Sequence, residues 1–213
     1  MVRRRYRLRF CKRGNLCFIG HRDLLRAMER ILRRAELPVA KSQGFHPKPR
    51  VSYLSALPLG FSSDDEAMEL ILEEDWPSET LLSRLNNASV DGLEFLRAVP
   101  LEEGAPKQQA LAFSYVMTVP EELAADVREK IAAFLAADSY EVEKSNGKLI
   151  DARPPVKALS LEGATLRLVL AAQTGPEAGV REILVCLGLA DRLFRSIFPN
   201  RDRCYIVDEE QGA

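Results

Sequence analysis

Two histidines, the only ones in the 213-residue chain, lie on either side of a basic stretch. His21 is followed closely by Asp23, and His46 belongs to the segment His46-Pro47-Lys48-Pro49-Arg50. Two imidazoles and a lysine could supply a general base, a general acid and a cation over a scissile phosphate without a metal. His21, His46 and Lys48 are therefore candidate catalytic residues. A predicted helix separates the histidines and nothing in the sequence brings them together, so structural or binding roles are favoured over catalysis.

That predicted helix carries a one-sided row of arginines. Between His21 and Glu36, apolar residues such as Leu24 and Met28 share one arc of the helical wheel, and arginines share the opposite arc. Few acids accompany the arginines, which favours an anion-binding surface over an ordinary solvated face. The predicted anion-binding or RNA-binding residues, on this helix and in the loop after it, are Arg22, Arg26, Arg30, Arg33, Gln43, Lys48 and Arg50.

The elements around this stretch have the order of a split βαβ fold. Residues 3–10 alternate apolar side chains with arginines, which predicts a strand with one buried face and one wet, cationic face. Two prolines within residues 44–49 predict an exposed loop or edge after the helix. Further strands are predicted at 51–54, 67–73 and 93–99, with a second helix beginning near 77–80, which gives the order β-α-β-β-α-β.

The same order is predicted to repeat after a linker at residues 104–109. The second half is expected to contain strands at 112–119, 165–172 and 204–207, helices at 121–136 and 179–187, and hairpin strands near 140–143 and 148–151. The predicted fold class is α+β, with two tandem ferredoxin-like (βαββαβ) units and antiparallel sheets. Their expected bounds are 1–103, with the basic helix and the His/Pro loop, and 110–213.

Composition indicates a globular protein with an uneven distribution of charge. The chain is 46% hydrophobic and 29% charged, with a formal net charge of −1. Residues 1–50 contain 15 Lys and Arg and three acids, a balance of +12, whereas residues 51–213 contain 15 basic and 28 acidic residues, a balance of −13. Such a chain can steer a polyanion to one end; the alternative is that the two charged regions neutralise each other in the fold. No apolar run approaches the roughly 18 residues of a membrane span, and the N-terminus does not resemble a signal peptide, so a cytoplasmic location without membrane contact is expected.

Common catalytic and metal-binding motifs are missing from the sequence. The spacing of Cys11, Cys17, Cys186 and Cys204 matches neither zinc knuckles nor an iron–sulfur loop, so reduced thiols are expected and no metal or cofactor is predicted on this chain. There is no glycine-rich phosphate loop and no nucleophile-elbow serine.

Four segments resemble one bacterial family. They are Tyr6–Phe10, Gly20–Arg26, Ser42–Pro47 with Pro49-Arg50, and Ala56–Gly60. They resemble the radical-SAM-associated domain family of unknown function, which occurs alone or fused behind a cobalamin-type radical S-adenosylmethionine protein. Members commonly have Ser where this chain has Gly20, and His or another polar residue where it has Lys48.

The resemblance implies a radical SAM protein as partner and an accessory or substrate-handling role, with no established activity. The partner is expected to carry the iron–sulfur cluster and the S-adenosylmethionine, because this chain lacks the three-cysteine cluster motif. The leading hypothesis is an accessory module that binds an anionic substrate, RNA in particular, and presents it to that enzyme. One alternative is a metal-independent RNA-processing enzyme that uses His21 and His46. The other is a protein–protein adaptor whose basic helix binds an acidic partner.

Overall fold

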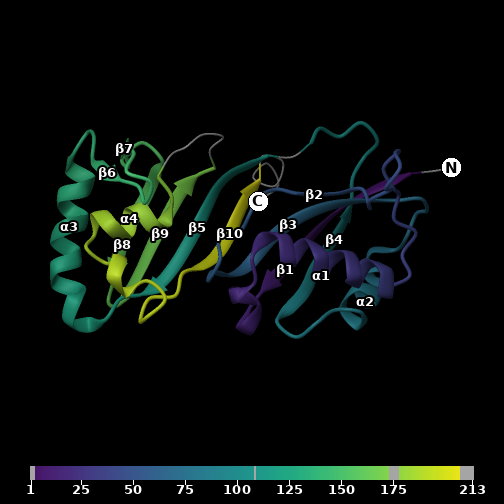
Figure 1. Ribbon diagram of the computed structural model, residues 1–213, viewed down its shortest axis with the longest axis horizontal. Coiled ribbons are helices and arrows are strands. Elements are labelled where there is room, and N and C mark those ends of the chain that lie inside the picture. Colours follow the sequence, from purple (N-terminus) through teal and green to yellow (C-terminus); the bar gives the residue numbers. More distant parts are fainter. Residues whose placement is uncertain (1–2, 108, 173–177, 207–213) are drawn as a thin grey trace. The chain divides into compact units, whose positions relative to one another are not determined.

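A computed structural model describes residues 3–107, 109–172 and 178–206 of the protein. Gln108 of the predicted linker and Val207 of the predicted last strand lie outside the described residues. The chain divides into two compact units, Met1–Gln109 and Ala110–Ala213. Each contains helices and an antiparallel sheet (Figure 1), which confirms the predicted α+β class.

In its described residues, 3–107 and 109, unit 1 contains four strands and two α-helices. In chain order they are β1 (Arg4–Lys12), α1 (His21–Arg34), β2 (Val51–Tyr53), β3 (Ser62–Leu72), α2 (Ser78–Asn87) and β4 (Leu93–Pro100), with a short 3-10 helix, η1 (Gly14–Phe18), before α1. Within the unit, β4 pairs with β1, β1 with β3, and β3 with β2, and all these pairs are antiparallel.

Both helices of unit 1 bury their apolar sides on one face of this sheet. Tyr6, Leu8 and Phe10 of β1 are almost completely buried, and they belong to one cluster with Met28 of α1 and Leu81 of α2. Because side chains alternate along a strand, the period of two in β1 places these three residues on the helix-covered face. The sequence prediction of a buried apolar face on this strand is confirmed.

The opposite face of β1, which carries Arg7 and Arg9, is not exposed to solvent. Arg7 and Arg9 are only 5% and 8% exposed. Arg7 lies 3.4 Å from the Glu69 carboxylate and Arg9 lies 3.0 Å from that of Asp65, both on the neighbouring strand β3. The expected solvated cationic face was therefore wrong, because acidic side chains of β3 lie beside these arginines and pair with them.

Unit 2 contains six strands and two α-helices among its described residues. They are β5 (Ala110–Thr118), α3 (Ala124–Ala136), β6 (Glu141–Glu143), β7 (Leu149–Asp151), β8 (Val156–Glu162), β9 (Thr165–Ala171), α4 (Val180–Cys186) and β10 (Asn200–Ile206), with 3-10 helices η2 (Glu121–Leu123) and η3 (Ala190–Arg192). Within this unit β10 pairs with β5, β5 with β9, and β9 with β8, all antiparallel, while β6 and β7 form a separate hairpin.

The second half thus differs from the predicted repeat. The strands expected near 140–143 and 148–151 pair only with each other, and the unpredicted strand β8 pairs with β9. A tight turn at Gly163, where φ is +59°, joins β8 to β9. Two tandem six-element units are therefore not evident from the order of the elements, because unit 2 carries an additional hairpin.

No helix among the described residues is both long enough and apolar enough to cross a lipid bilayer.

Candidate anion-binding site

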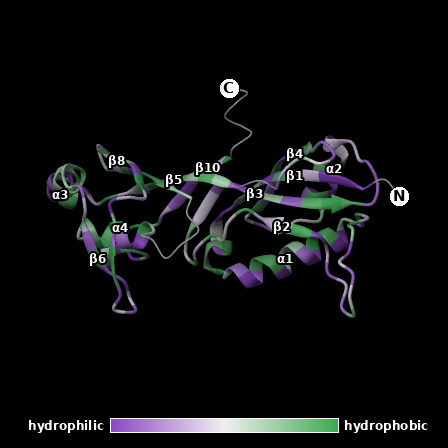
Figure 2. Ribbon diagram, turned by 90° about the horizontal axis from the view of Figure 1, so that it is seen from above, coloured by the Kyte–Doolittle hydropathy of each residue, from purple (hydrophilic) through white to green (hydrophobic). Residues whose placement is uncertain are grey.

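Helix α1 presents its arginines to solvent because its other side is committed to the core. Leu24, Met28, Ile31 and Leu32 are buried, whereas the arginines at positions 22, 26, 30 and 33 are exposed. Hydrophilic and hydrophobic positions accordingly recur along α1 in Figure 2. The helix ends at Arg34, and Glu36 follows with a left-handed φ of 52°. The predicted amphipathic helix is confirmed.

Three of these arginines line one pocket. Its volume is about 530 Å³, within the range of small-molecule sites. It lies between α1 and the segment that follows the helix, and both cationic and apolar side chains line it. Its lining consists of Arg26, Glu29, Arg30, Leu32, Arg33, Leu37, Val39, Lys41 and Pro49.

The charge of the pocket is strongly positive. Four cations line it against one acid, Glu29. Arg26 forms an exposed pair with Asp23 of the same helix, at 3.1 Å. Within the described ranges, no ion pair engages Arg30, Arg33 or Lys41. These side chains therefore remain available to an anion, and Glu29 is the one acid in the pocket lining that offsets their repulsion.

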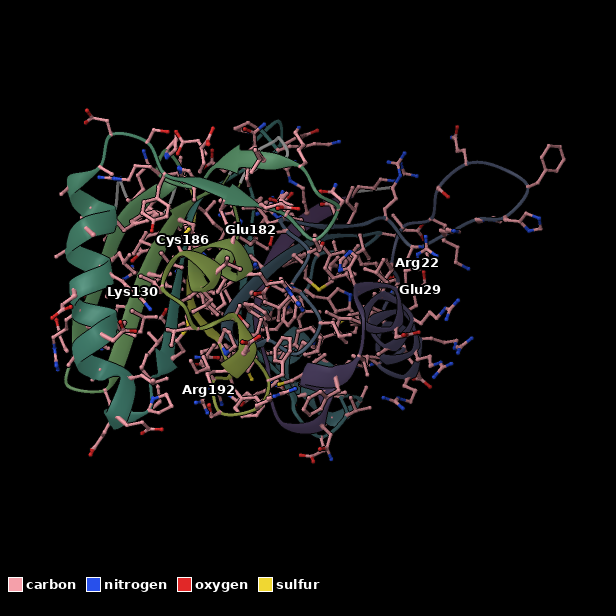
Figure 3. All side chains as sticks on the ribbon, turned by 60° about the vertical axis from the view of Figure 1, so that its left-hand side comes forward. Arg22, Glu29, Lys130, Glu182, Cys186 and Arg192 are labelled. Carbon is pink, nitrogen blue, oxygen red and sulfur yellow. The ribbon has the colours of Figure 1, made fainter. Side chains whose placement is uncertain are left out.

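A projecting loop begins and ends at the rim of this pocket. Lys41 and Pro49, which both line the pocket, are bridged to each other across the loop. The Ser42 N–H donates to the Lys48 carbonyl at 2.8 Å, and the Lys48 N–H donates to the Ser42 hydroxyl at 3.0 Å. Between these residues the loop extends away from the rest of unit 1, at the right of Figure 3. The expectation of an exposed loop at residues 44–49 is confirmed in that most of these residues are exposed.

The predicted binding residues occupy two neighbouring places. Arg26, Arg30 and Arg33 lie on the pocket, and Arg22 lies exposed nearer the start of α1, where Figure 3 labels it with Glu29. The loop carries the other predicted binding residues, Gln43, Lys48 and Arg50, together with the catalytic candidate His46, and all four are exposed.

Two residues of this region were missed by the sequence reasoning. Lys41 lines the pocket, and Phe45 is fully exposed in the projecting loop. The available signal for Phe45 was its place between a glycine and a histidine in a segment bracketed by prolines, where a core position is unfavourable. Nothing in the sequence predicted Lys41 as a pocket residue, because its place on the pocket depends on the path that the chain takes after α1.

The two histidines lie in different environments. His21, the first residue of α1, forms a T-shaped ring contact with Tyr53 of β2, with ring centroids 5.8 Å apart, and its Nδ1 is buried without a hydrogen-bond partner. His46 is exposed in the loop. In the part of the chain that the structure describes, no ring contact joins them. The arrangement supports separate roles rather than a preformed acid–base pair.

Tyr53 links His21 to the acid of the pocket. Burial raises the pKa of the Tyr53 hydroxyl above its usual value, and the nearby Glu29 carboxylate raises it further. Tyr53 is therefore neutral at physiological pH and adds no charge beside Glu29.

A buried lysine donates a hydrogen bond to the turn before α1. Lys12 is 1% exposed, and its ammonium donates to the Ile19 carbonyl at 3.2 Å. Burial lowers the pKa of Lys12, while Cys17 and Glu66 act in the opposite direction. The Gly60 N–H donates to the Cys17 carbonyl at 2.8 Å and so joins residues 56–60 to the same turn. One segment that carries the family resemblance, Gly20–Arg26, thus contains the start of α1, and another, Ala56–Gly60, is joined to the turn before it.

No group of three or more His, Cys, Asp or Glu side chains among the described residues is placed to hold a metal ion. The chemistry that this surface offers is electrostatic: several guanidinium groups and an ammonium beside apolar surface, suited to phosphates or carboxylates.

Fold and site together define an α+β protein with a cationic pocket on its first helix. The chain belongs to the family described as "Uncharacterized protein conserved in bacteria (DUF2344)", whose model matches residues 5–181. No match is found among curated proteins. Family membership agrees with the bacterial resemblance seen in the sequence, whereas association with a radical enzyme stays a prediction.

Proposed function

We propose that this protein is an accessory module that binds RNA on the surface formed by α1 and the loop 41–50, and presents it to a radical S-adenosylmethionine enzyme. One observation carries the proposal: Arg26, Arg30, Arg33 and Lys41 line one pocket with a single acid. Guanidinium groups bind phosphate through paired hydrogen bonds, and phosphate contacts supply most of the affinity in sequence-independent binding.

Other features of unit 1 support this surface over the rest of the molecule. Arg7 and Arg9 of β1 are buried and paired with acids of β3, so they cannot contribute. Between Leu37 and Ser63 the sequence contains no Asp or Glu, so the segment after α1 adds only positive charge. The enzyme partner rests on the family resemblance, and that partner would supply the iron–sulfur cluster and S-adenosylmethionine.

Charge reversal on α1 tests the proposal. The triple variant Arg26→Glu/Arg30→Glu/Arg33→Glu is expected to lose at least about 100-fold in affinity for a fluorescently labelled single-stranded RNA, measured by anisotropy at 50 mM salt, since three phosphate contacts become repulsions. Arg97→Glu is the matched control, because Arg97 is an exposed arginine on β4 of the same unit, outside the pocket lining. Equal affinity of both variants, or no RNA binding by the wild type, would refute the proposal.

The enzyme partner needs a separate test. Affinity purification of the tagged full-length chain from its own cells is expected to retain a radical S-adenosylmethionine protein after nuclease treatment. Recovery of RNA alone would limit the proposal to RNA binding. Recovery of an acidic protein, without nucleic acid and lost in the triple variant, would favour the adaptor alternative.

RNA cleavage by His21 and His46 has less support, because His21 packs on Tyr53 whereas His46 is exposed in the loop. If cleavage is observed, the double variant His21→Ala/His46→Ala tests whether these two histidines catalyse it. Unchanged cleavage by this variant would exclude the two histidines as the catalytic pair.

We also propose that each unit is a variant of the ferredoxin-like fold. Support comes from the strand pairings: β4-β1-β3-β2 in unit 1 and β10-β5-β9-β8 in unit 2 follow the same path through the chain if the hairpin of β6 and β7 is treated as an insertion. An experimental structure with a different strand order in either unit would refute this assignment.

A further inference from the structure

Phe45 is fully exposed, the most exposed of the large apolar side chains among the described residues. An aromatic ring in water gains nothing for the fold, because folding stability comes from removing apolar surface from water. The side chain is therefore available to a ligand, and replacing it should leave the folded structure intact.

The loop that carries Phe45 is anchored at its base. In addition to the two hydrogen bonds between Ser42 and Lys48, the Arg50 N–H donates to the Ala40 carbonyl at 2.7 Å, and the Ala40 N–H donates to the Ile71 carbonyl of β3 at 2.8 Å. The base of the loop is thus tied to the sheet of unit 1. Gly44 has a φ of +147°, a backbone conformation that residues with a side chain rarely adopt.

The distance from the pocket to Phe45 suits a nucleic acid strand. Phe45 lies four residues from Lys41 and four from Pro49, and both of these line the pocket. Four residues reach at most about 14 Å. A stacked strand, which advances about 3.4 Å per nucleotide, covers that distance with roughly four nucleotides. One strand could therefore place phosphates at the pocket and a base at Phe45.

The charges around Phe45 favour a nucleic acid, with its phosphates and flat bases, as the ligand of this side chain over an apolar pocket on another protein. Lys41, Lys48 and Arg50 flank the ring on both sides in sequence and are exposed. An apolar pocket on a protein would have to accept or desolvate these cations, whereas RNA offers phosphates to them and a base to the ring.

From this arrangement we infer that Phe45 stacks on a base of single-stranded RNA whose phosphates lie at the pocket of Arg26, Arg30, Arg33 and Lys41. The inference rests on the proposed function and adds a substrate class to it: the RNA must have an unpaired base about four nucleotides or fewer from the phosphates at the pocket. A continuous duplex hides the faces of its bases and should gain nothing from Phe45.

Three substitutions in the full-length chain separate stacking from simple apolar contact. Phe45→Ala is expected to weaken binding to a labelled single-stranded RNA about tenfold, and Phe45→Leu similarly, since leucine lacks a planar π face. Phe45→Trp is expected to match or exceed the wild type. An RNA of the same length with abasic nucleotides at all positions should bind wild type and Phe45→Ala equally, and so should a duplex. All three variants should keep the wild-type thermal unfolding midpoint.

Each contrary result has a distinct meaning. If wild type binds no RNA, the proposed function and the inference both fall. If the arginine triple variant loses binding but Phe45→Ala binds single-stranded RNA like the wild type, only the inference falls. If Phe45→Leu matches the wild type while Phe45→Ala is weak, the contact is apolar and stacking is refuted. If Phe45→Ala keeps RNA binding but loses a co-purifying protein, Phe45 is a protein anchor and the inference is overturned.

Discussion

Gly92 occupies a position in unit 1 where both the backbone conformation and the available space require glycine. Its φ is +81°, and a Cβ at this position would lie 2.4 Å from the Arg13 carbonyl oxygen. The Arg13 N–H also donates to the Gly92 carbonyl at 2.7 Å, so the two chain segments cannot separate without losing that bond. This contact fixes the turn at the end of β1, close to the segment that leads into α1.

Gly92→Ala is therefore expected to lower the free energy of unfolding by about 2–5 kcal/mol, through left-handed strain and the close contact. Gly104→Ala is the matched control, because Gly104 has a similar φ of +79° but nothing within 4 Å of its Cβ position. It should lose only about 1–2 kcal/mol. Urea denaturation measures both losses, and equal losses would show that the contact with Arg13 relaxes freely.

Tyr6 combines a core position with a hydrogen-bonded hydroxyl. The ring is buried, the hydroxyl donates to the Asp75 carboxylate at 2.5 Å, and it accepts the Trp76 N–H at 2.7 Å. Burial raises the pKa of Tyr6 above its usual value, and the hydrogen bond to Asp75 raises it further. The folded state thus favours the neutral hydroxyl.

Tyr6→Phe should lower the free energy of unfolding by about 1–3 kcal/mol at pH 7, because the Trp76 N–H loses its acceptor. A raised pKa in the folded state contributes stability that is complete below the unfolded value of 10.0 and is lost as pH rises toward the folded pKa. The difference between wild type and Tyr6→Phe should therefore shrink above about pH 10. A difference that grows with alkaline pH in urea titrations would contradict the assignment.

At the scale of elements, the two sides of α1 have different roles: the buried side contributes to folding stability, and the exposed side is proposed to bind RNA. Met28 is completely buried in the core of unit 1, whereas Arg30 is exposed on the pocket. Met28→Ala is expected to cost about 2–5 kcal/mol of unfolding free energy. Arg30→Ala should change it by less than about 0.5 kcal/mol and should weaken RNA binding instead. Denaturation and anisotropy on the same two variants test the division, and a large stability loss in Arg30→Ala would contradict it.

For the whole molecule, the proposed binding depends on local charge and not on net charge. The chain carries a net charge of −1, so long-range attraction of RNA to the whole protein is weak. If Arg26, Arg30, Arg33 and Lys41 each contact one phosphate of a single strand, the slope of log affinity against log salt should be about −3. The triple arginine variant should flatten this slope, and Arg97→Glu should keep it. A slope near zero in the wild type would exclude phosphate contacts at the pocket.

The sequence alone determined the features that depend on local periodicity. The alternation in β1 and the helical period of α1 predict these elements because side-chain direction repeats every 2 and about 3.6 residues, whatever the rest of the chain does. The exposed loop at residues 44–49 followed equally locally from its prolines. The arginine row on α1 was predictable for the same reason, since burial of Leu24 and Met28 leaves the arginines outside.

Only the tertiary structure decided which charges are available and which short strands share a sheet. Arg7 and Arg9 resemble the arginines of α1 in sequence, yet they are paired with Glu69 and Asp65 from a distant part of the chain. β8 joins the sheet of unit 2 while the hairpin of β6 and β7 remains apart. Lys41 reaches the pocket because the chain folds back past the end of α1. Pairing between residues far apart in the chain carries no local period, so these outcomes required the folded molecule.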